Sequence, residues 1–262
     1  MSYQFIVISA TEERQIKMRE QFAMLERAVN VHYLEASMIS NSKDYLDGYN
    51  DETKFKFICC ARSHIRALEY ATKSVHSCEF SIILEDDAAF YKEGFLALIE
   101  EIIGNWHEYG IHKMISIGWV PCQELNYDVF LKLNRKYTEL TAVPGTKVTH
   151  KYYMPGLQGY IVKNSDIPYM EYLLQPTYIE FCNKMKSCQH YIDVQKKFGT
   201  YSIDNDLVSV DVYINLLFKQ GIVFPPLVIE QEVPSLLGHK NNVYWDMFFK
   251  NYESERTKYM FY

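Results

Sequence analysis

Three acidic side chains directly follow an apolar run. They are Glu85, Asp86 and Asp87, and the run is Ser81–Leu84. A continuous apolar run of this length predicts a strand buried on both faces. Carboxylates packed so closely have raised pKa values unless a cation is present, and a divalent ion would also neutralise a bound diphosphate. No Cys or His lies beside the triplet in the sequence, so oxygen ligation favours Mn²⁺ or Mg²⁺. The alternative is a solvated acidic loop.

Strands that alternate with helices predict an α/β sheet with right-handed crossovers, and ligands gather at the carboxyl ends of such strands. Because side chains alternate along a strand, we expect Glu85 and Asp87 on one face and Asp86 on the other, unless a turn begins here. We expect strands over 5–8, 31–36, 81–84, 113–120 and, broken by two prolines, 222–231. We expect helices over 12–28, 60–75, 95–106 and 208–221, the last ending at Gly221, and a loop over 40–52.

Composition limits the classes of partner. Lys and Arg number 27 against 33 Asp and Glu, a net charge of −6 that argues against nucleic acid and requires a cation or a local basic cluster for an anionic substrate. The six cysteines show no CxxC spacing and are expected to be reduced. The N-terminus lacks the features of a signal peptide, and no run of about 18 apolar residues occurs. We therefore expect a soluble, cytoplasmic protein without a transmembrane segment, with peripheral membrane contact left open.

Two neighbouring blocks resemble a known family. FICCARSHIRALEYA, residues 57–71, followed by SIILEDDAAFYKEGF, residues 81–95, is similar to the paired signature of glycosyltransferase family 25, the lipooligosaccharide and collagen galactosyl- or glucosyltransferase-like family. That signature is a Gly-Cys-x-x-Ser-His helix start and a strand ending in Glu-Asp-Asp. Cys60, Ser63 and His64 match it, whereas Cys59 stands where the family has glycine.

Weaker matches follow in the family's order, within a resemblance that spans about residues 5–239. They are IVISATEER (6–14), MPGLQGYIVKNSD (154–166) and SVDVYINLLFKQGIVFPPLVIEQ (209–231). The resemblance implies a GT-A type fold, with a Rossmann-like, mostly parallel central sheet flanked by helices. It implies one domain over 1–262, with residues 1–120 binding the nucleotide-sugar and 121–262 the acceptor. It also implies metal-dependent, inverting transfer of a hexose, galactose or glucose, from a UDP-sugar to a glycan or other hydroxyl acceptor.

The resemblance implies a role for several residues. Metal ligands would be Asp87, Asp86 and the late His239, with a surface histidine as the alternative for His239. Donor-binding residues would be Ser9, Arg14, Arg62, Ser63, His64, Glu85 and Asp86. Arg62, Ser63 and His64 are expected at a helix start, where N–H groups and positive charge favour anions. Acceptor-binding residues would be Trp119, Gln158 and Tyr160.

Inverting transfer needs a base for the acceptor hydroxyl. We assign Asp211 to this role, with Asp204 and Asp206 as rivals and plain helix capping as the alternative for Asp211. Two other functions stay open: a catalytically degenerate relative that binds a nucleotide-sugar or a partner, and a metal-dependent nucleotidyltransferase. The second lacks support, since the sequence has no P-loop.

Overall fold

The computed structural model describes residues 1–109, 113–118, 156–198, 210–218, 220–223 and 226–231. The strands are β1 (Tyr3–Ser9), β2 (Val31–Glu35), β3 (Phe80–Glu85), β4 (Ala88–Phe90), β5 (Met114–Gly118), β6 (Gly159–Lys163), β7 (Gln220–Ile222) and β8 (Val228–Glu230). The helices are α1 (Glu12–Ala23), α2 (Lys43–Leu46), α3 (Phe55–Lys73), α4 (Phe95–Gly104), α6 (Met170–Leu173), α7 (Tyr178–Lys186), α8 (Gln189–Phe198) and α10 (Val210–Phe218). Short 3₁₀ turns are η1 (Glu52–Lys54), η2 (Trp106–Tyr109) and η3 (Asn164–Asp166).

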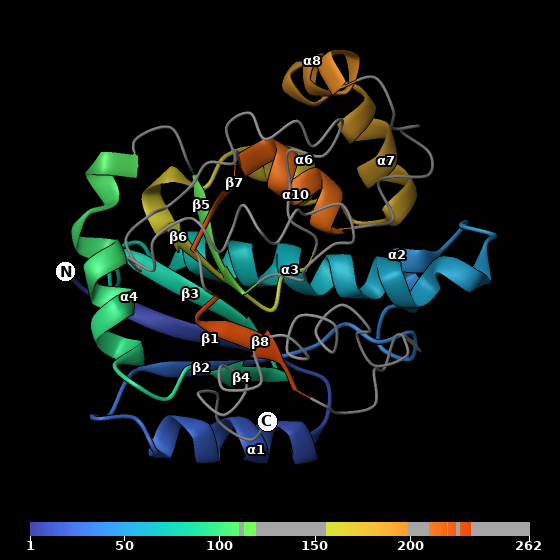
Figure 1. Ribbon diagram of the computed structural model, residues 1–262. Coiled ribbons are helices and arrows are strands. Elements are labelled where there is room, and N and C mark those ends of the chain that lie inside the picture. The colour runs from blue at the N-terminus through green and yellow to red at the C-terminus, as the bar shows by residue number, and fades with distance from the viewer. Residues whose placement is uncertain (110–112, 119–155, 199–209, 219, 224–225, 232–262) are drawn as a thin grey trace, which may run out of the picture.

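One sheet joins all the described strands. Its order is β2-β1-β3-β6-β5-β8-β4, and β7 also pairs with β5. β1 is parallel to both β2 and β3, whereas β6 runs antiparallel to β3 and β5. The strands and their covering helices confirm the predicted α/β class, with a sheet that is mixed at β6 and β4 (Figure 1).

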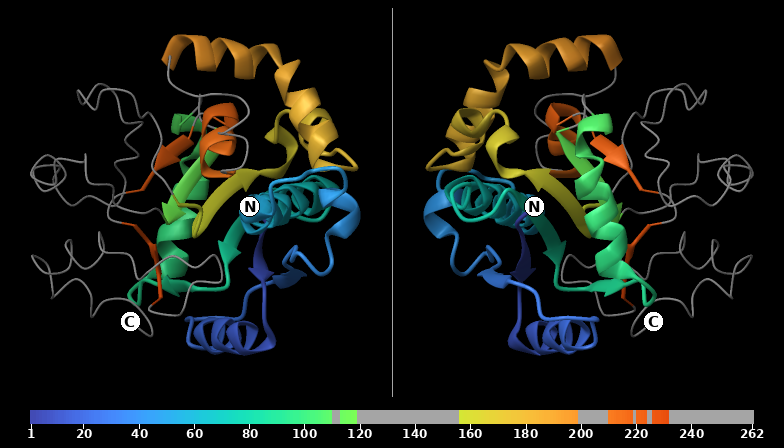
Figure 2. Two further views of the ribbon diagram at one scale, coloured as in Figure 1. Left: turned by 90° about the vertical axis from the view of Figure 1, so that its right-hand side faces the viewer. Right: turned by 90° about the vertical axis from the view of Figure 1, so that its left-hand side faces the viewer.

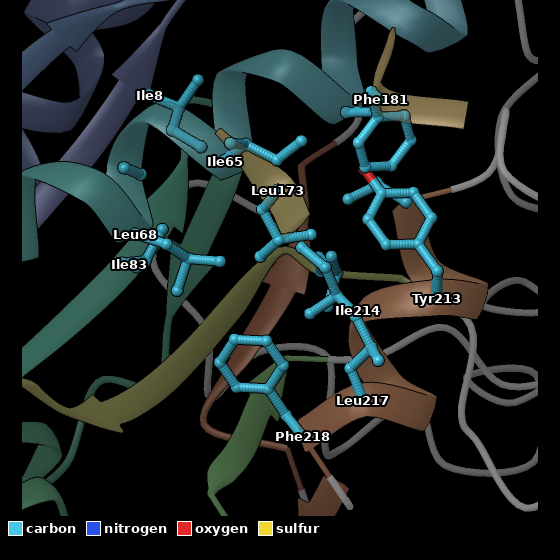
Figure 3. Packing of buried hydrophobic residues seen from close by; sticks show 14 of the residues in the cluster. Ile8, Ile65, Leu68, Ile83, Leu173, Phe181, Tyr213, Ile214, Leu217 and Phe218 are labelled. Atoms are coloured by element: carbon cyan, nitrogen blue, oxygen red, sulfur yellow. The ribbon is translucent and has the colours of Figure 1, made fainter. Parts of the chain in front are cut away.

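Both faces of the central strands are buried, as their apolar runs predict. In β1, Ile6 and Ile8 pack toward α3, α7 and α10, whereas Phe5 and Val7 pack toward α1 and α4. β3 divides in the same way, which is the two-residue period of a strand. Figure 2 shows the sheet between these two groups of helices, and Figure 3 shows the cluster where Ile83 meets side chains of α3 and α10. The carboxyl ends of β1 and β3 are thereby held on a rigid frame.

Several predicted boundaries are wrong. α3 begins at Phe55, five residues before the predicted start, so the Cys60–His64 segment lies inside the helix. Gly221 lies in β7 instead of capping α10, because residues 220–222 pair with β5. The predicted loop over 40–52 contains α2, and α1 ends at Ala23.

No helix in the described part of the chain is long and apolar enough to cross a bilayer.

Candidate functional site

The acidic triplet lies where two parallel strands end side by side. Ile8 of β1 pairs with Glu85 of β3, so the segment after β1 comes to lie against the turn after β3. The backbone N–H of Ala10 donates to Oδ2 of Asp86 at 2.6 Å. This position at the carboxyl ends of the strands is where the sequence predicts a ligand site.

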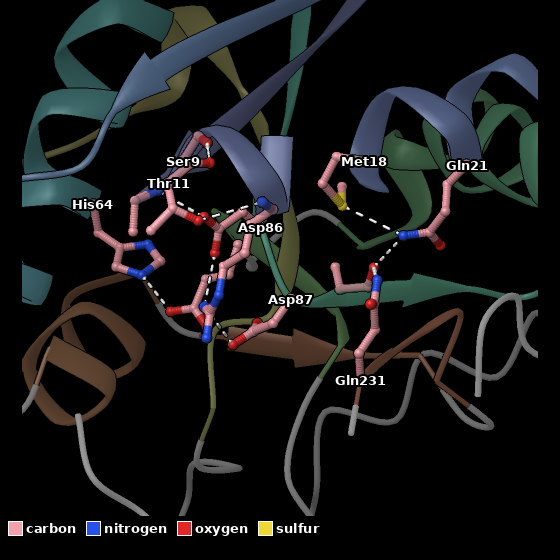
Figure 4. A network of polar contacts seen from close by, with 12 residues as sticks. Ser9, Thr11, Met18, Gln21, His64, Asp86, Asp87 and Gln231 are labelled. Atoms are coloured by element: carbon pink, nitrogen blue, oxygen red, sulfur yellow. Dashed lines mark hydrogen bonds and ion pairs between the residues drawn. The ribbon is translucent and has the colours of Figure 1, made fainter. Parts of the chain in front are cut away.

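Arg14 connects the two aspartates. Thr11 is the N-cap of α1, where its Oγ1 accepts from the Arg14 backbone N–H at 3.3 Å and places Arg14 in the first helical turn. Nη1 of Arg14 lies 3.0 Å from Oδ1 of Asp86 and 3.4 Å from Oδ2 of Asp87 (Figure 4). Asp86 is 5% exposed and Arg14 11%, so this is a largely buried ion pair.

Asp87 has one oxygen without a partner. Its Oδ1 is buried and accepts no hydrogen bond. Burial raises the pKa of Asp87 well above its usual value, the nearby charges of Glu85, Glu230 and Asp86 add to the rise, and Arg14 opposes it. Within the described part of the chain, three negative charges and one guanidinium therefore act on Asp87, so positive charge is in deficit there. The oxygens of Asp86 and Asp87 fit a hard divalent cation, because such an ion supplies the missing charge and takes the orphaned oxygen as a ligand.

Glu85 turns toward a different set of partners. Its Oε1 lies 3.0 Å from Nε2 of His64, while Nδ1 of the same ring lies 3.1 Å from the hydroxyl of Tyr160. Burial, followed by the charge of Glu85, raises the pKa of Tyr160 well above its usual value, so the phenol keeps its proton. A carboxylate accepts only, so Nε2–H donates to Glu85, whereas the direction of the hydrogen bond between Nδ1 and the Tyr160 hydroxyl depends on the protonation of the ring.

The triplet does not alternate, because the turn that was named as the exception to the alternation begins here. Glu85 faces α3, whereas Asp86 and Asp87 share Arg14. β3 ends at Glu85 and a turn begins at Asp86, so the two-residue period of the strand no longer applies.

Cys60 is a neighbour of this arrangement that the sequence interpretation did not include. It precedes His64 by one helical turn and therefore lies on the same side of α3. The candidate ligand atoms of Cys60, His64 and Glu85 all lie within 4.8 Å of one another. The signal in the sequence was the spacing Cys-x-x-x-His within a helix.

Two glutamines fix the turn that carries Asp87. Nε2 of Gln21 and Nε2 of Gln231 both donate to the carbonyl oxygen of Ala88, at 2.7 and 2.8 Å. Gln21 also accepts from the N–H of Phe90 at 2.9 Å, and the N–H of Gln231 donates to the Asp87 carbonyl at 2.7 Å. Figure 4 shows these amides on the far side of Asp87 from His64. Isolated glutamines gave no sequence signal for this role.

Two predicted donor-binding residues do not face the carboxylates. Arg62 lies over the ring of Tyr45, with its guanidinium carbon 4.5 Å from the ring centroid. Ser63 donates to the Cys59 carbonyl at 2.9 Å and accepts from the Ser37 N–H at 2.8 Å. The expectation of a helix start here is wrong, since N–H groups inside a helix are already hydrogen-bonded.

The structure brings the other described donor residues to one edge of the sheet. Ser9 ends β1 beside Ala10, and its hydroxyl donates to the Thr11 carbonyl at 3.2 Å. Of the predicted acceptor residues, Tyr160 contacts His64, and Gln158 accepts the Glu85 N–H at 3.1 Å through its carbonyl. Asp211 is the second residue of α10. The other predicted site residues lie outside the described residues: Trp119, Asp204, Asp206 and His239.

Comparisons with known proteins give a weak structural similarity. No family model and no curated protein matches the chain. The chain is similar to the galactosyltransferase LgtC in complex with donor and acceptor sugar analogs, with a TM-score of 0.42 and 9% identity over 96% of this chain and 95% of that one. An active-site mutant of LgtC gives the same TM-score and identity over 98% and 96%. Membership in family 25 accordingly stays a prediction, and function must be inferred from the site itself.

Proposed function

We propose that the chain is a metal-dependent glycosyltransferase that moves a hexose, galactose or glucose, from a UDP-sugar to a glycan or another hydroxyl acceptor. The observation that carries the proposal is Asp87, whose buried Oδ1 lacks a partner beside two other carboxylates and one arginine. The resemblance to family 25 supplies the class of reaction. The cation, Mn²⁺ or Mg²⁺, supplies positive charge to the diphosphate as it leaves.

Each residue of the site is proposed to have a separate role. Asp87 and Asp86 hold the cation, and His239 is proposed as a further ligand. Arg14 sets the distance between the two aspartates and adds a permanent positive charge near the diphosphate. Glu85, held by His64, faces the ribose or the waters of the ion, and Ser9 borders the nucleotide.

The acceptor half of the reaction is assigned with inversion at the anomeric carbon. A base removes the proton of the acceptor hydroxyl, whose oxygen then bonds to the anomeric carbon as the bond to the diphosphate breaks. Asp211 is our base. Its helix packs against α3, and burial raises the pKa of Tyr213, two residues further on, with Cys60 and Tyr160 among the groups that add to the rise.

The metal and nucleotide assignment is tested by thermal denaturation of the full chain. UDP and Mn²⁺ together should raise the melting temperature by more than the sum of the shifts that each ligand causes alone, because the two ligands share one site. Equal shifts with and without EDTA would contradict the proposal. Screening UDP- and GDP-sugars for metal-dependent hydrolysis then identifies the donor.

A catalytically degenerate relative is the second candidate, since Cys59 departs from the glycine of the family signature. Such a protein would show the shift in melting temperature with Mn²⁺ and UDP but no turnover of any donor.

In an active enzyme, Asp211→Asn should keep UDP affinity and lose about 10²-fold or more in turnover. Near-normal turnover would move the role of base to Asp204 or Asp206.

A further inference from the structure

A second group of candidate ligands lies next to the aspartates and differs from them in chemistry. Sγ of Cys60, a ring nitrogen of His64 and a carboxylate oxygen of Glu85 lie within 4.8 Å of one another. Cys60 and His64 come from successive turns of α3, and Glu85 comes from the end of β3. Sulfur, imidazole and one carboxylate form a ligand set that hard ions such as Mg²⁺ do not select and that zinc does.

We propose that Cys60, His64 and Glu85 bind a zinc-class ion, at a site separate from the cation site of Asp86 and Asp87. Three protein ligands leave a fourth tetrahedral position for water or another small ligand. The site shares Glu85 and His64 with the proposed donor site, but the observations behind it, the side chains of α3 and β3, do not depend on the glycosyltransferase proposal.

The distances suit such an ion. Zinc bonds of ordinary length place the ligand atoms of a tetrahedral site roughly 3.3–3.6 Å apart. Nε2 of His64 and Oε1 of Glu85 are now 3.0 Å apart and joined by a hydrogen bond, and no pair among the three ligand atoms exceeds 4.8 Å. A pair of ligand atoms at the 4.8 Å limit would have to approach by about 1.2–1.5 Å, a movement that rotamer changes of two side chains can share. The ion replaces that hydrogen bond, and the thiol releases its proton to solvent.

Tyr160 provides the outer support that zinc-bound histidines have. Such a histidine usually passes its other ring N–H to a fixed acceptor, which sets the orientation of the ring. The Tyr160 hydroxyl lies 3.1 Å from Nδ1 and belongs to a fully buried side chain. When Nε2 binds the ion, Nδ1 carries the proton and donates it to the Tyr160 oxygen.

The site is also reachable from solvent. His64 is 0% exposed, but Glu85 is 26% exposed and Cys60 is partly exposed. Two of the three ligands are therefore in contact with solvent, and the third is buried. The neighbouring Cys59 is buried in the core cluster. It is a matched control thiol, because it could replace Cys60 as a ligand only if α3 rotated about its axis.

The test uses cobalt as a spectroscopic probe of the full chain, stripped with EDTA, dialysed, and reduced with a phosphine. Co²⁺ should produce a thiolate-to-cobalt charge-transfer band and the visible bands of a tetrahedral ion. Zinc should abolish both, and excess Mg²⁺ should leave them unchanged. Absence of the thiolate band, or its loss with Mg²⁺, overturns the proposal.

Variants locate the ligands. Cys60→Ser should remove the thiolate band, whereas Cys59→Ser should keep it. Tyr160→Phe should lower cobalt affinity by about 10-fold, as loss of an outer partner usually does. A band that persists in Cys60→Ser, or that disappears in a folded Cys59→Ser, contradicts the assignment.

A measurement on the wild-type chain covers the case in which Cys60→Ser does not fold. Zinc should slow iodoacetamide labelling of Cys60, located by fragment-ion mass spectrometry, by about 10-fold or more relative to the zinc-free chain. An unchanged rate at Cys60 overturns the proposal. These results are independent of UDP binding, so failure here leaves the proposed function standing, and failure of UDP binding leaves the zinc site standing.

Discussion

The carboxylates on the two sides of the acidic turn have different kinds of partner. On the side of α1, Asp86 and Asp87 face one permanent cation, Arg14, and an oxygen of Asp87 has no partner. On the side of α3, Glu85 faces the ring of His64, whose two nitrogens are both hydrogen-bonded. Among the described residues, the first side has fewer positive than negative charges, whereas the second side is already joined by hydrogen bonds before the proposed zinc-class ion binds.

The difference shows that neighbouring carboxylates need not share a function. The strand ends after Glu85, and the turn sends the next two side chains away from it. A pair left short of charge suits an ion that comes and goes with a substrate, whereas a hydrogen-bonded network can keep its ligand atoms in place before its own ion binds. Three substitutions test this distinction.

The largest effect is expected from Asp87→Asn. The variant should lose the joint shift with Mn²⁺ and UDP, and turnover should fall by about 10³-fold, because several kcal/mol of charge stabilisation disappear. Without metal, the same variant should be at least as stable as the wild type, since a neutral amide replaces a buried carboxylate that has one oxygen without a partner and only a 3.4 Å contact to Arg14 at the other. Asp44→Asn, on the exposed surface of α2, is the control for the change in net charge. A metal-free Asp87→Asn that is clearly destabilised would show that Asp87 is structural.

The next effect concerns the ion pair. Arg14→Met should lower the free energy of unfolding of the metal-free chain by about 3 kcal/mol, because two nearly buried carboxylates lose their cation. Mn²⁺ should restore part of that loss. Arg19→Met, on the same helix, removes only a contact over the ring of Tyr33 and should cost about 0.5–1 kcal/mol. Denaturant unfolding of both variants, with and without Mn²⁺, measures the difference. Equal costs would mean that Arg14 does not balance the aspartates.

The smallest effect on metal and UDP binding is expected on the α3 side of the acidic turn. Tyr160→Phe removes the hydrogen bond between the Tyr160 hydroxyl and the buried Nδ1 of His64 and should cost about 1–3 kcal/mol in unfolding free energy. Tyr33→Phe, on β2, should stay within about 0.5 kcal/mol of the wild type. The joint shift with Mn²⁺ and UDP should survive in Tyr160→Phe. If that shift disappeared, the two sides would be coupled and the contrast between them would fail.

Much of the frame was predictable from the sequence because its signals are local. The apolar runs of β1 and β3 and the helical spacing of α1 and α4 gave their positions within a few residues. The end of β3 at the acidic triplet followed from the same run. α7 also carried a signal, a capping box between Thr177 and Glu180, that the sequence interpretation did not use.

The rest depends on contacts that the sequence does not display. α3 starts at Phe55 after Lys54, which makes no side-chain cap, so nothing marked the start. Gly221 resembled a helix end, but pairing with β5 drew it into a strand. The approach of Cys60 to Glu85 joins segments 25 positions apart and depends on the packing of α3 against β3.

The two glutamine amides that donate to the Ala88 carbonyl become available at different times during synthesis of the chain. Gln21 is 67 positions from Ala88 and is made before it, whereas Gln231 is 143 positions away and is made long after it. At about 5–20 residues per second, a ribosome needs roughly 7–30 s to span the later gap. Throughout that interval the turn bearing Asp87 has only one of its two amide anchors. A growing polypeptide halted before position 231 should therefore carry a folded β1–β3 frame whose Asp87 turn is not yet fully fixed.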